Sequence, residues 1–144
     1  MLAETHPAVE RMHTALHEFV NGDTAEWQAM CSHGADTTLF GGWGGHEKGW
    51  EQLGPRYDWA AARFLKGGSE VRQEIVSSGG NDDFYYTVAF ERSSVRLAGQ
   101  AEPMPMALRV THIYRRENGE WKLLHRHADP LVAIQTAESV IERR

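Results

Sequence analysis

The segment HRHAD, residues 125–129, brings together three side chains of types that can bind a metal ion. Side chains alternate between the two faces of a β-strand, so His125, His127 and Asp129 would lie in a row on one face. Histidine nitrogens and carboxylate oxygens are ligands that zinc takes in proteins. The row is therefore a metal site, a catalytic group or a polar part of the scaffold.

The turn before this strand, in RRENGEW, decides which other side chains join the row. If Asn118 and Gly119 form a two-residue turn, His112 lies opposite His125 on the neighbouring strand. Three histidines and an aspartate would then converge on one face. This register predicts a zinc site.

The alternative is a three-residue loop over residues 117–119, with Gly119 as the left-handed bulge residue. His112 then lies opposite Leu124 and shares its face with Arg126. The histidines of HRHAD point to the other face, and the metal-ligand set is dispersed.

The composition excludes several classes of function. The chain has 144 residues, with 15 Lys and Arg against 20 Asp and Glu and a net charge of −5, so nucleic acid is not an expected partner. Cys31 is the single cysteine, which excludes an internal disulfide. No apolar run is as long as a membrane span, and the first ten residues lack a signal-peptide pattern. We expect a cytoplasmic protein with no membrane partner.

Apolar spacing in the N-terminal half predicts helices. Thr5 can cap the first helix, and Pro7 suits its first turn. The predicted elements are a helix over 5–22, a short helix from 23, a strand over 36–40, a loop over 41–45, and a helix over 46–65 that Pro55 breaks.

From Gly68 onward the pattern changes to strands rich in β-branched and aromatic residues. Asp129 before Pro130 has the form of a helix start, so we expect a last helix over 129–144. The four predicted strands cover 69–78, 83–97, 105–116 and 120–128. Helices followed by an antiparallel run indicate a single α+β domain over 1–144.

The segments LRVTHIYRRENGEWKLLHRHADP and DDFYYTVAFER, after a helical N-terminal half, resemble the nuclear transport factor 2-like superfamily, and the SnoaL-like small bacterial proteins in particular. The chain is also similar to the association (hub) domain of calcium/calmodulin-dependent protein kinase II. The shared pattern T-x-x-x-x-R-x-x-G-x-W…H-x-H is matched by Thr111, Arg116, Gly119, Trp121, His125 and His127.

The resemblance implies a cone-shaped, curved antiparallel sheet wrapped by N-terminal helices around a deep pocket, in the cystatin-like manner. It also implies a homodimer through the outer sheet face, where Thr111, Ile113, Trp121, Leu123, His125 and His127 would lie. The hub domain's pocket arginines correspond to Glu91, His112 and Ala128 here, so none of them is kept. The placement of His112 and Ala128 on the pocket face favours the three-residue loop. In that register His112 lies apart from His125 and His127, so we expect no metal.

Three residues are the candidates for chemistry. His112 on a pocket-facing strand can act as acid or base near neutral pH, or it is a hydrogen-bonded core histidine. Glu91 can serve as a second acid–base group, or it pairs with Arg109 or Arg126. Arg126 can orient a carbonyl or stabilise an oxyanion, or it only holds Glu91.

The remaining expected pocket residues are apolar, and the glycine-rich loop around Trp43 is expected at the pocket rim. The expected ligand-binding residues are Trp43, Tyr57, Trp59, Val110, Leu124 and Ala128. Two functions follow. One is a cofactor-free isomerase, dehydratase or cyclase that acts on a small apolar ketone- or polyketide-like compound. The other is a non-catalytic ligand-binding or oligomerisation module of the same fold.

Overall fold

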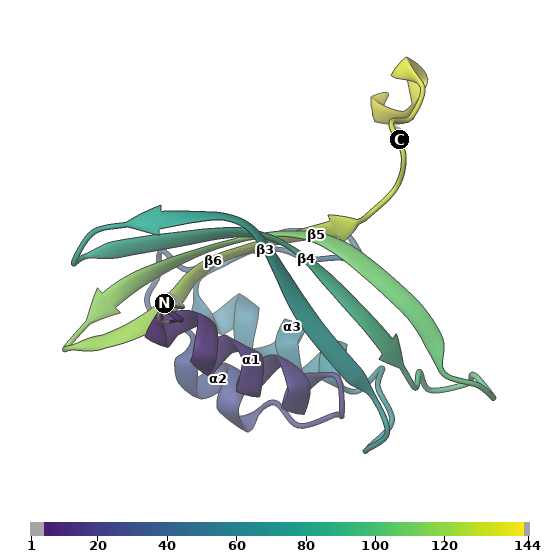
Figure 1. Ribbon diagram of the computed structural model, residues 1–144, viewed down its shortest axis with the longest axis horizontal. Helices are drawn as coiled ribbons and strands as arrows, with labels where there is room; N and C mark the ends of the chain where they lie inside the picture. Colours follow the sequence, from purple (N-terminus) through teal and green to yellow (C-terminus); the bar gives the residue numbers. More distant parts are fainter. Residues whose placement is uncertain (1–4, 143–144) are drawn as a thin grey trace.

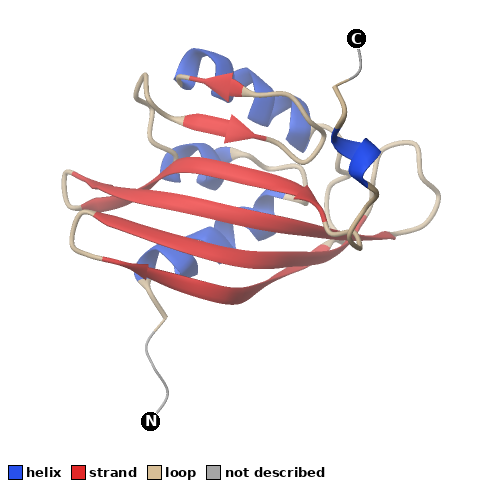
Figure 2. Ribbon diagram, turned by 90° about the horizontal axis from the view of Figure 1, so that it is seen from above, coloured by secondary structure: helices blue, strands red, loops and turns tan. Residues whose placement is uncertain are grey.

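The structure is a computed structural model that describes residues 5–142. Its three α-helices all lie on one side of a curved, unclosed sheet of six strands (Figure 1). Seen from above in Figure 2, the sheet lies in front of these helices. The predicted α+β class, a curved sheet with N-terminal helices, is confirmed.

Helix α1 (Pro7–Phe19) buries one apolar stripe against the sheet. Its N-cap is His6, whose Nδ1 accepts a hydrogen bond from the amide of Ala8 at 3.1 Å, and not Thr5 as predicted. Helix α2 (Ala25–Met30) begins where the Asp23 carboxylate accepts a hydrogen bond from the amide of Ala25. Each of these two hydrogen bonds satisfies an amide that has no partner within its helix.

Helix α3 (Trp50–Ala61) runs without interruption through Pro55, so the predicted break is wrong. Pro55 lies in the second turn of the helix, where it removes a single helical hydrogen bond, to the carbonyl of Glu51. The short strands β1 (Thr38–Phe40) and β2 (Glu47–Lys48) precede the helix.

Four long strands form most of the sheet: β3 (Glu70–Gly80), β4 (Phe84–Val95), β5 (Met104–Glu117) and β6 (Glu120–Pro130). The strand order is β2-β1-β6-β5-β4-β3, and β1 runs parallel to β6 while the other pairs are antiparallel. The bulges in β3 and β6 add local bend and twist to the sheet.

The β5–β6 turn has two residues, so the predicted three-residue loop is wrong. Glu117 pairs with Glu120, and Asn118 and Gly119 both have positive φ, of 51° and 81°. A bulge at Leu124 then shifts the register by one residue. After this shift the odd and even positions exchange faces.

Because of the bulge, His112 lies opposite Arg126, and Thr111 lies opposite His127. The predicted grouping of His112 with Arg126 on the inner face therefore holds, although His112 does not lie opposite Leu124. Trp121 and Leu123, which we expected on the outer face, lie before the bulge, where Leu123 is part of the core and the partly buried Trp121 packs against it.

The predicted helix over 129–144 is also wrong for its described part. Asp129 and Pro130 are the last residues of β6, and the amide of Leu131 bonds to the carbonyl of Ala107. The Asp129 carboxylate accepts a hydrogen bond from Arg109 on β5, so it is not available as a helix cap. A short 3-10 turn, η1 (Ala137–Val140), follows, and residues 143 and 144 lie outside the described residues.

The core fills the space between the helices and the inner face of the sheet. Trp27, Tyr114, Met12, Met30 and Leu53 are among its largest fully buried side chains. No helix within residues 5–142 is long and apolar enough to cross a membrane.

Candidate functional site

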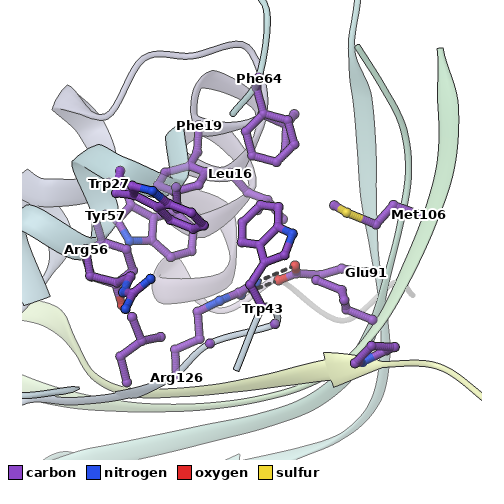
Figure 3. Close-up of a pocket in the computed structure, with 18 of the residues that line it drawn as sticks. Leu16, Phe19, Trp27, Trp43, Arg56, Tyr57, Phe64, Glu91, Met106 and Arg126 are labelled. Atoms are coloured by element: carbon purple, nitrogen blue, oxygen red, sulfur yellow. Dashed lines mark hydrogen bonds and ion pairs between the residues drawn. The ribbon is translucent and has the colours of Figure 1, made fainter. Parts of the chain in front are cut away.

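A cavity of about 400 Å³ opens between the helices and the inner face of the sheet. Its walls are mainly aromatic and aliphatic side chains from α1, α2, α3 and β5, as Figure 3 shows. The described residues whose side chains carry charge at its surface are Arg56, Glu91 and Arg126. A cavity of this size and composition matches small-molecule sites in other proteins.

Glu91 on β4 and Arg126 on β6 form a two-pronged ion pair across the intervening strand β5. Arg126 Nη1 donates to Glu91 Oε2 at 2.7 Å, and Nη2 donates to Oε1 at 2.9 Å (Figure 3). The Arg126 side chain is only 11% exposed, and the Glu91 side chain is only 5% exposed. The Arg126 guanidinium also lies 5.2 Å from the ring centroid of Trp27. Parallel hydrogen bonds and an aromatic partner fix its orientation.

His112 lies next to this pair, with both ring nitrogens in use. Nε2 accepts a hydrogen bond from Arg126 Nη1 at 2.9 Å, because a guanidinium can only donate. The neutral ring therefore carries its proton on Nδ1, which donates to the hydroxyl of Tyr114 at 3.1 Å. Burial and the neighbouring Arg126 charge hold the pKa of His112 well below its usual value. The imidazole is neutral at pH 7.

A second ion pair lies near the mouth of the cavity. Arg56 Nε on α3 donates to Glu47 Oε1 on β2 at 2.7 Å. The Arg56 guanidinium lies 5.1 Å from the ring centroid of Trp59, and Arg63 lies 4.8 Å from the same ring. Trp59 is thus held by two cations at the edge of the cavity.

The glycine-rich loop places Trp43 at the mouth. Trp43 is about half exposed, and its ring meets Trp59 edge-on at 5.6 Å and Phe64 at 6.0 Å. Gly44 and Gly45 follow it with φ of +94° and +76°, which residues other than glycine rarely adopt. The loop conformation thus depends on glycine where it carries the indole across the opening.

The structure separates the predicted site residues into two groups. Trp43, Tyr57, Trp59, Glu91 and Arg126 line the cavity. His112, Val110 and Ala128 lie on the inner face of the sheet but are buried and absent from the described lining, and Leu124 is the bulge residue. His112 therefore contacts the cavity only through Arg126.

Sequence reasoning missed several lining residues, among them Arg56 and Trp27. Arg56 neighbours Tyr57 and lies three positions from Trp59 on the same helix, and this spacing was a usable signal. Nothing local in the sequence marks Trp27, because its access to the cavity depends on how α2 docks, whereas Phe64 was expected on the helix that covers the pocket and does line it.

The HRHAD row lies outside this site, on the outer face of the sheet. His125 Nδ1 is 2.7 Å from the hydroxyl of Thr38, and His127 Nε2 is 3.5 Å from Asp129 Oδ2. Within residues 5–142, no group of three or more His, Cys, Asp or Glu side chains is placed to hold a metal ion.

Solved structures share this fold at low sequence identity. A nuclear transport factor 2-like superfamily protein from Salmonella enterica serovar Typhimurium aligns with a TM-score of 0.75 and 13% identity, over 91% of this chain and 93% of that chain. A candidate dehydratase of the NTF2-like family from Streptomyces avermitilis gives 0.68 and 18%, over 88% and 97%. A candidate calcium/calmodulin-dependent protein kinase type II association domain from Thiobacillus denitrificans gives 0.67 and 16%, over 92% and 100%.

Sequence comparison agrees with the fold. No protein of curated function matches the chain. The sequence model of the SnoaL-like domain matches residues 8–133, which is most of the chain. The recognition of an NTF2-like fold is thereby confirmed, and the chain belongs to the SnoaL-like domain family.

Proposed function

We propose that this protein binds a small, largely apolar molecule in the cavity, with a carbonyl oxygen of the guest at the Glu91–Arg126 pair. The observation that carries the proposal is the cavity itself, about 400 Å³ of mainly aromatic and aliphatic surface with one buried ion pair inside it. A mostly apolar pocket gains affinity from its walls, and its few polar groups orient the guest.

The charges in the cavity favour a neutral guest. Glu91 balances Arg126, and Glu47 balances Arg56, so a guest with a charge of its own would be buried without a counter-ion. A guanidinium has five N–H groups, and Arg126 uses three of them on Glu91 and His112. The remaining N–H groups have no acceptor among the described residues, and a ketone oxygen supplies one.

Matched probes test this binding mode. We expect the bicyclic ketone α-tetralone to bind at least about tenfold more tightly than tetralin, the hydrocarbon of the same skeleton, because the ketone adds a hydrogen bond to a charged donor. Isothermal titration calorimetry measures both. Trp43→Ala should weaken both probes alike, and Arg109→Met, on the outer face, should change neither. Equal affinities for the two probes would contradict a polar role for the pair.

Proton transfer is the second candidate function, in an isomerase, dehydratase or cyclase reaction. Glu91 favours it, because it is the one carboxylate among the described residues that line the cavity. A ketone oxygen that takes a hydrogen bond from Arg126 would also acidify the adjacent carbon, and a second lone pair of a Glu91 oxygen would accept its proton. In this scheme His112 holds Arg126 and is not the base.

Hydrogen–deuterium exchange at the carbon next to the tetralone carbonyl, followed by NMR in D₂O, tests the catalytic role. If Glu91 is the base, Glu91→Gln should slow the protein-dependent exchange by a factor of about 10²–10⁴ while tetralone still binds. His112→Gln keeps an acceptor for Arg126 and should retain most of the exchange. If the wild-type protein binds tetralone tightly but does not accelerate the exchange, the catalytic role is contradicted and binding is the function that remains.

We also infer a homodimer through the outer face of the sheet. Phe40, Phe84, Tyr86 and Val88 are exposed there, beside His125 and His127. Such an apolar face is unusual on a monomer. The fold is shared with association domains. Multi-angle light scattering at micromolar concentration should give the mass of two chains, and a monomer there would overturn the inference.

A further inference from the structure

Two guanidinium groups contact the indole of Trp59 at the mouth of the cavity. The guanidinium carbon of Arg56 on α3 lies 5.1 Å from the ring centroid, and that of Arg63, just after the helix, lies 4.8 Å from it. Trp59 lines the cavity and is also 41% exposed, so its indole connects the interior with the surface. A molecule that leaves the cavity beside Trp59 therefore meets two cations.

Both guanidinium groups are anchored through Nε and keep their terminal nitrogens free for another partner. Arg56 Nε donates to Glu47 Oε1 at 2.7 Å, and Arg63 Nε donates to the carbonyl of Trp59 at 3.2 Å. Among the described residues, the Nη atoms of these two arginines have no hydrogen-bond acceptor. A side chain whose orientation is already fixed loses less conformational entropy when it binds a ligand. The mouth thus presents preorganised N–H donors.

The mouth also carries an excess of positive charge. Glu47 offsets the charge of Arg56, but Arg63 forms no ion pair with a carboxylate of residues 5–142. The Glu47 side chain is 11% exposed and that of Arg56 is 38% exposed, so solvent meets mainly the guanidinium of this pair. The nearby carboxylate of Asp58 accepts a hydrogen bond from Gln28 on α2. The field at the mouth therefore attracts an anion.

We propose that the guest carries an anionic group, a carboxylate or a phosphate, on a tail that leaves the cavity beside Trp59 and binds the Arg63 guanidinium, with that of Arg56 on the same indole. The planar guanidinium pairs with either anion through parallel hydrogen bonds. The charge stays at the solvated mouth, and only the neutral body of the guest is buried. The inference rests on the proposed function and adds the class of guest, a neutral carbonyl compound with a charged tail.

Ketone probes with and without the charge test the tail. The benzene ring of α-tetralone is extended by ether chains of three lengths that end in a carboxylate, and the methyl ester of each acid is its neutral control. In about 0.01 M salt, isothermal titration calorimetry should find a chain length at which the acid binds about tenfold more tightly than its own ester. In about 1 M salt the preference should largely disappear, because salt screens exposed charges.

Variants assign the preference to the mouth. Arg63→Met removes the guanidinium and should abolish the preference for acid over ester, whereas Arg63→Lys keeps the charge without the planar fork and should retain part of it. The matched control is Arg116→Met, which removes another exposed arginine, at the other end of β5 from the lining residues Pro105 and Met106, and should keep the full preference. Acid and ester are compared on the same variant, so a change in the cavity walls affects both.

Phosphonates on the same chains distinguish the two anions, and the one that binds more tightly is the anion that the mouth selects. If no acid or phosphonate binds more tightly than its ester, or if the preference survives in Arg63→Met, the charged tail is overturned. Binding of α-tetralone itself is the separate measure of the proposed function, which then still stands. If neither α-tetralone nor any of its extended forms binds, both proposals fail.

Discussion

The two faces of the sheet each carry an arginine–carboxylate pair that includes a residue of β6, and the pairs differ in almost everything except chemistry. Arg126 and Glu91 on the inner face are 11% and 5% exposed, and two parallel hydrogen bonds join them. Arg109 and Asp129 on the outer face are 57% and 37% exposed, and one hydrogen bond of 2.7 Å joins them.

The difference lies in what surrounds each pair. The inner pair is fixed from other directions too, by the hydrogen bond to His112 and by the Trp27 ring. Water reaches the outer pair and screens it. A charge pair with many fixed partners specifies one geometry at the cavity, whereas a solvated pair can separate at little cost. Only the inner pair is suited to position a guest.

Removal of Arg126 should give the largest effect. Arg126→Met keeps most of the side-chain volume but leaves the Glu91 carboxylate buried without a partner, which typically destabilises a protein by about 3–5 kcal/mol. Urea denaturation followed by circular dichroism measures the free energy of unfolding. The double variant Arg126→Met with Glu91→Leu should recover much of that loss, because no unpaired charge remains. A loss below about 1 kcal/mol in the single variant would show that water reaches the inner pair as well.

The inner face was predictable from the sequence only in part. Strand periodicity and the resemblance placed His112, Arg126 and Glu91 on one face, and the structure has them there. The three-residue turn between β5 and β6, which was expected to produce this arrangement, was a wrong prediction. A two-residue turn and a bulge at Leu124 give the same final face as a longer loop, and local sequence does not distinguish the two routes.

Other failures have the same origin in tertiary contacts. Asp129 before Pro130 has the local form of a helix cap, but Arg109 lies opposite Asp129 and extends the strand through it. For His112 the sequence left two roles open, an acid–base group or a hydrogen-bonded core histidine, and its contacts favour the second. The structure occupies both nitrogens, through Arg126 on a neighbouring strand and Tyr114 two residues along.

The neutral state of His112 should make stability depend on pH. Its pKa in the folded protein lies well below 6.5, because burial and Arg126 both oppose the imidazolium. Between its folded pKa and 6.5 the unfolded chain binds more protons, so stability falls as pH falls through this window, by up to about 1.4 kcal/mol per pH unit for one proton. Above about pH 7 this contribution no longer changes.

Denaturation of wild type and His112→Gln at several pH values from 5 to 8 isolates this contribution. Glutamine can accept from Arg126 and donate to Tyr114 without titrating. His125 and His6 also have pKa values below the usual range, mainly through burial, but both are present in the two proteins, so most of their contribution cancels in the difference. The wild type should lose more stability than the variant below pH 6.5. Parallel curves would mean that His112 can bind a proton without disturbing Arg126.

The outer pair should give the smallest effect, and it closes the comparison. Arg109→Met removes the same kind of group as Arg126→Met, from the same sheet, but it leaves Asp129 in contact with water. Arg109 lowers the pKa of Asp129 through their hydrogen bond, so the pair contributes stability above about pH 4 and loses it as the carboxylate is protonated at lower pH. Because solvent screens this pair in the single chain, we expect the denaturation midpoint at pH 7, measured on protein dilute enough to be monomeric, to stay within experimental error of wild type, and any small shift to vanish in about 1 M salt. At concentrations where the proposed dimer forms, a larger, salt-independent loss is expected, because a dimer through the outer face covers the pair. The measurement is therefore repeated across protein concentrations, because a shift that shrinks on dilution belongs to the interface and one that does not shrink belongs to the single chain.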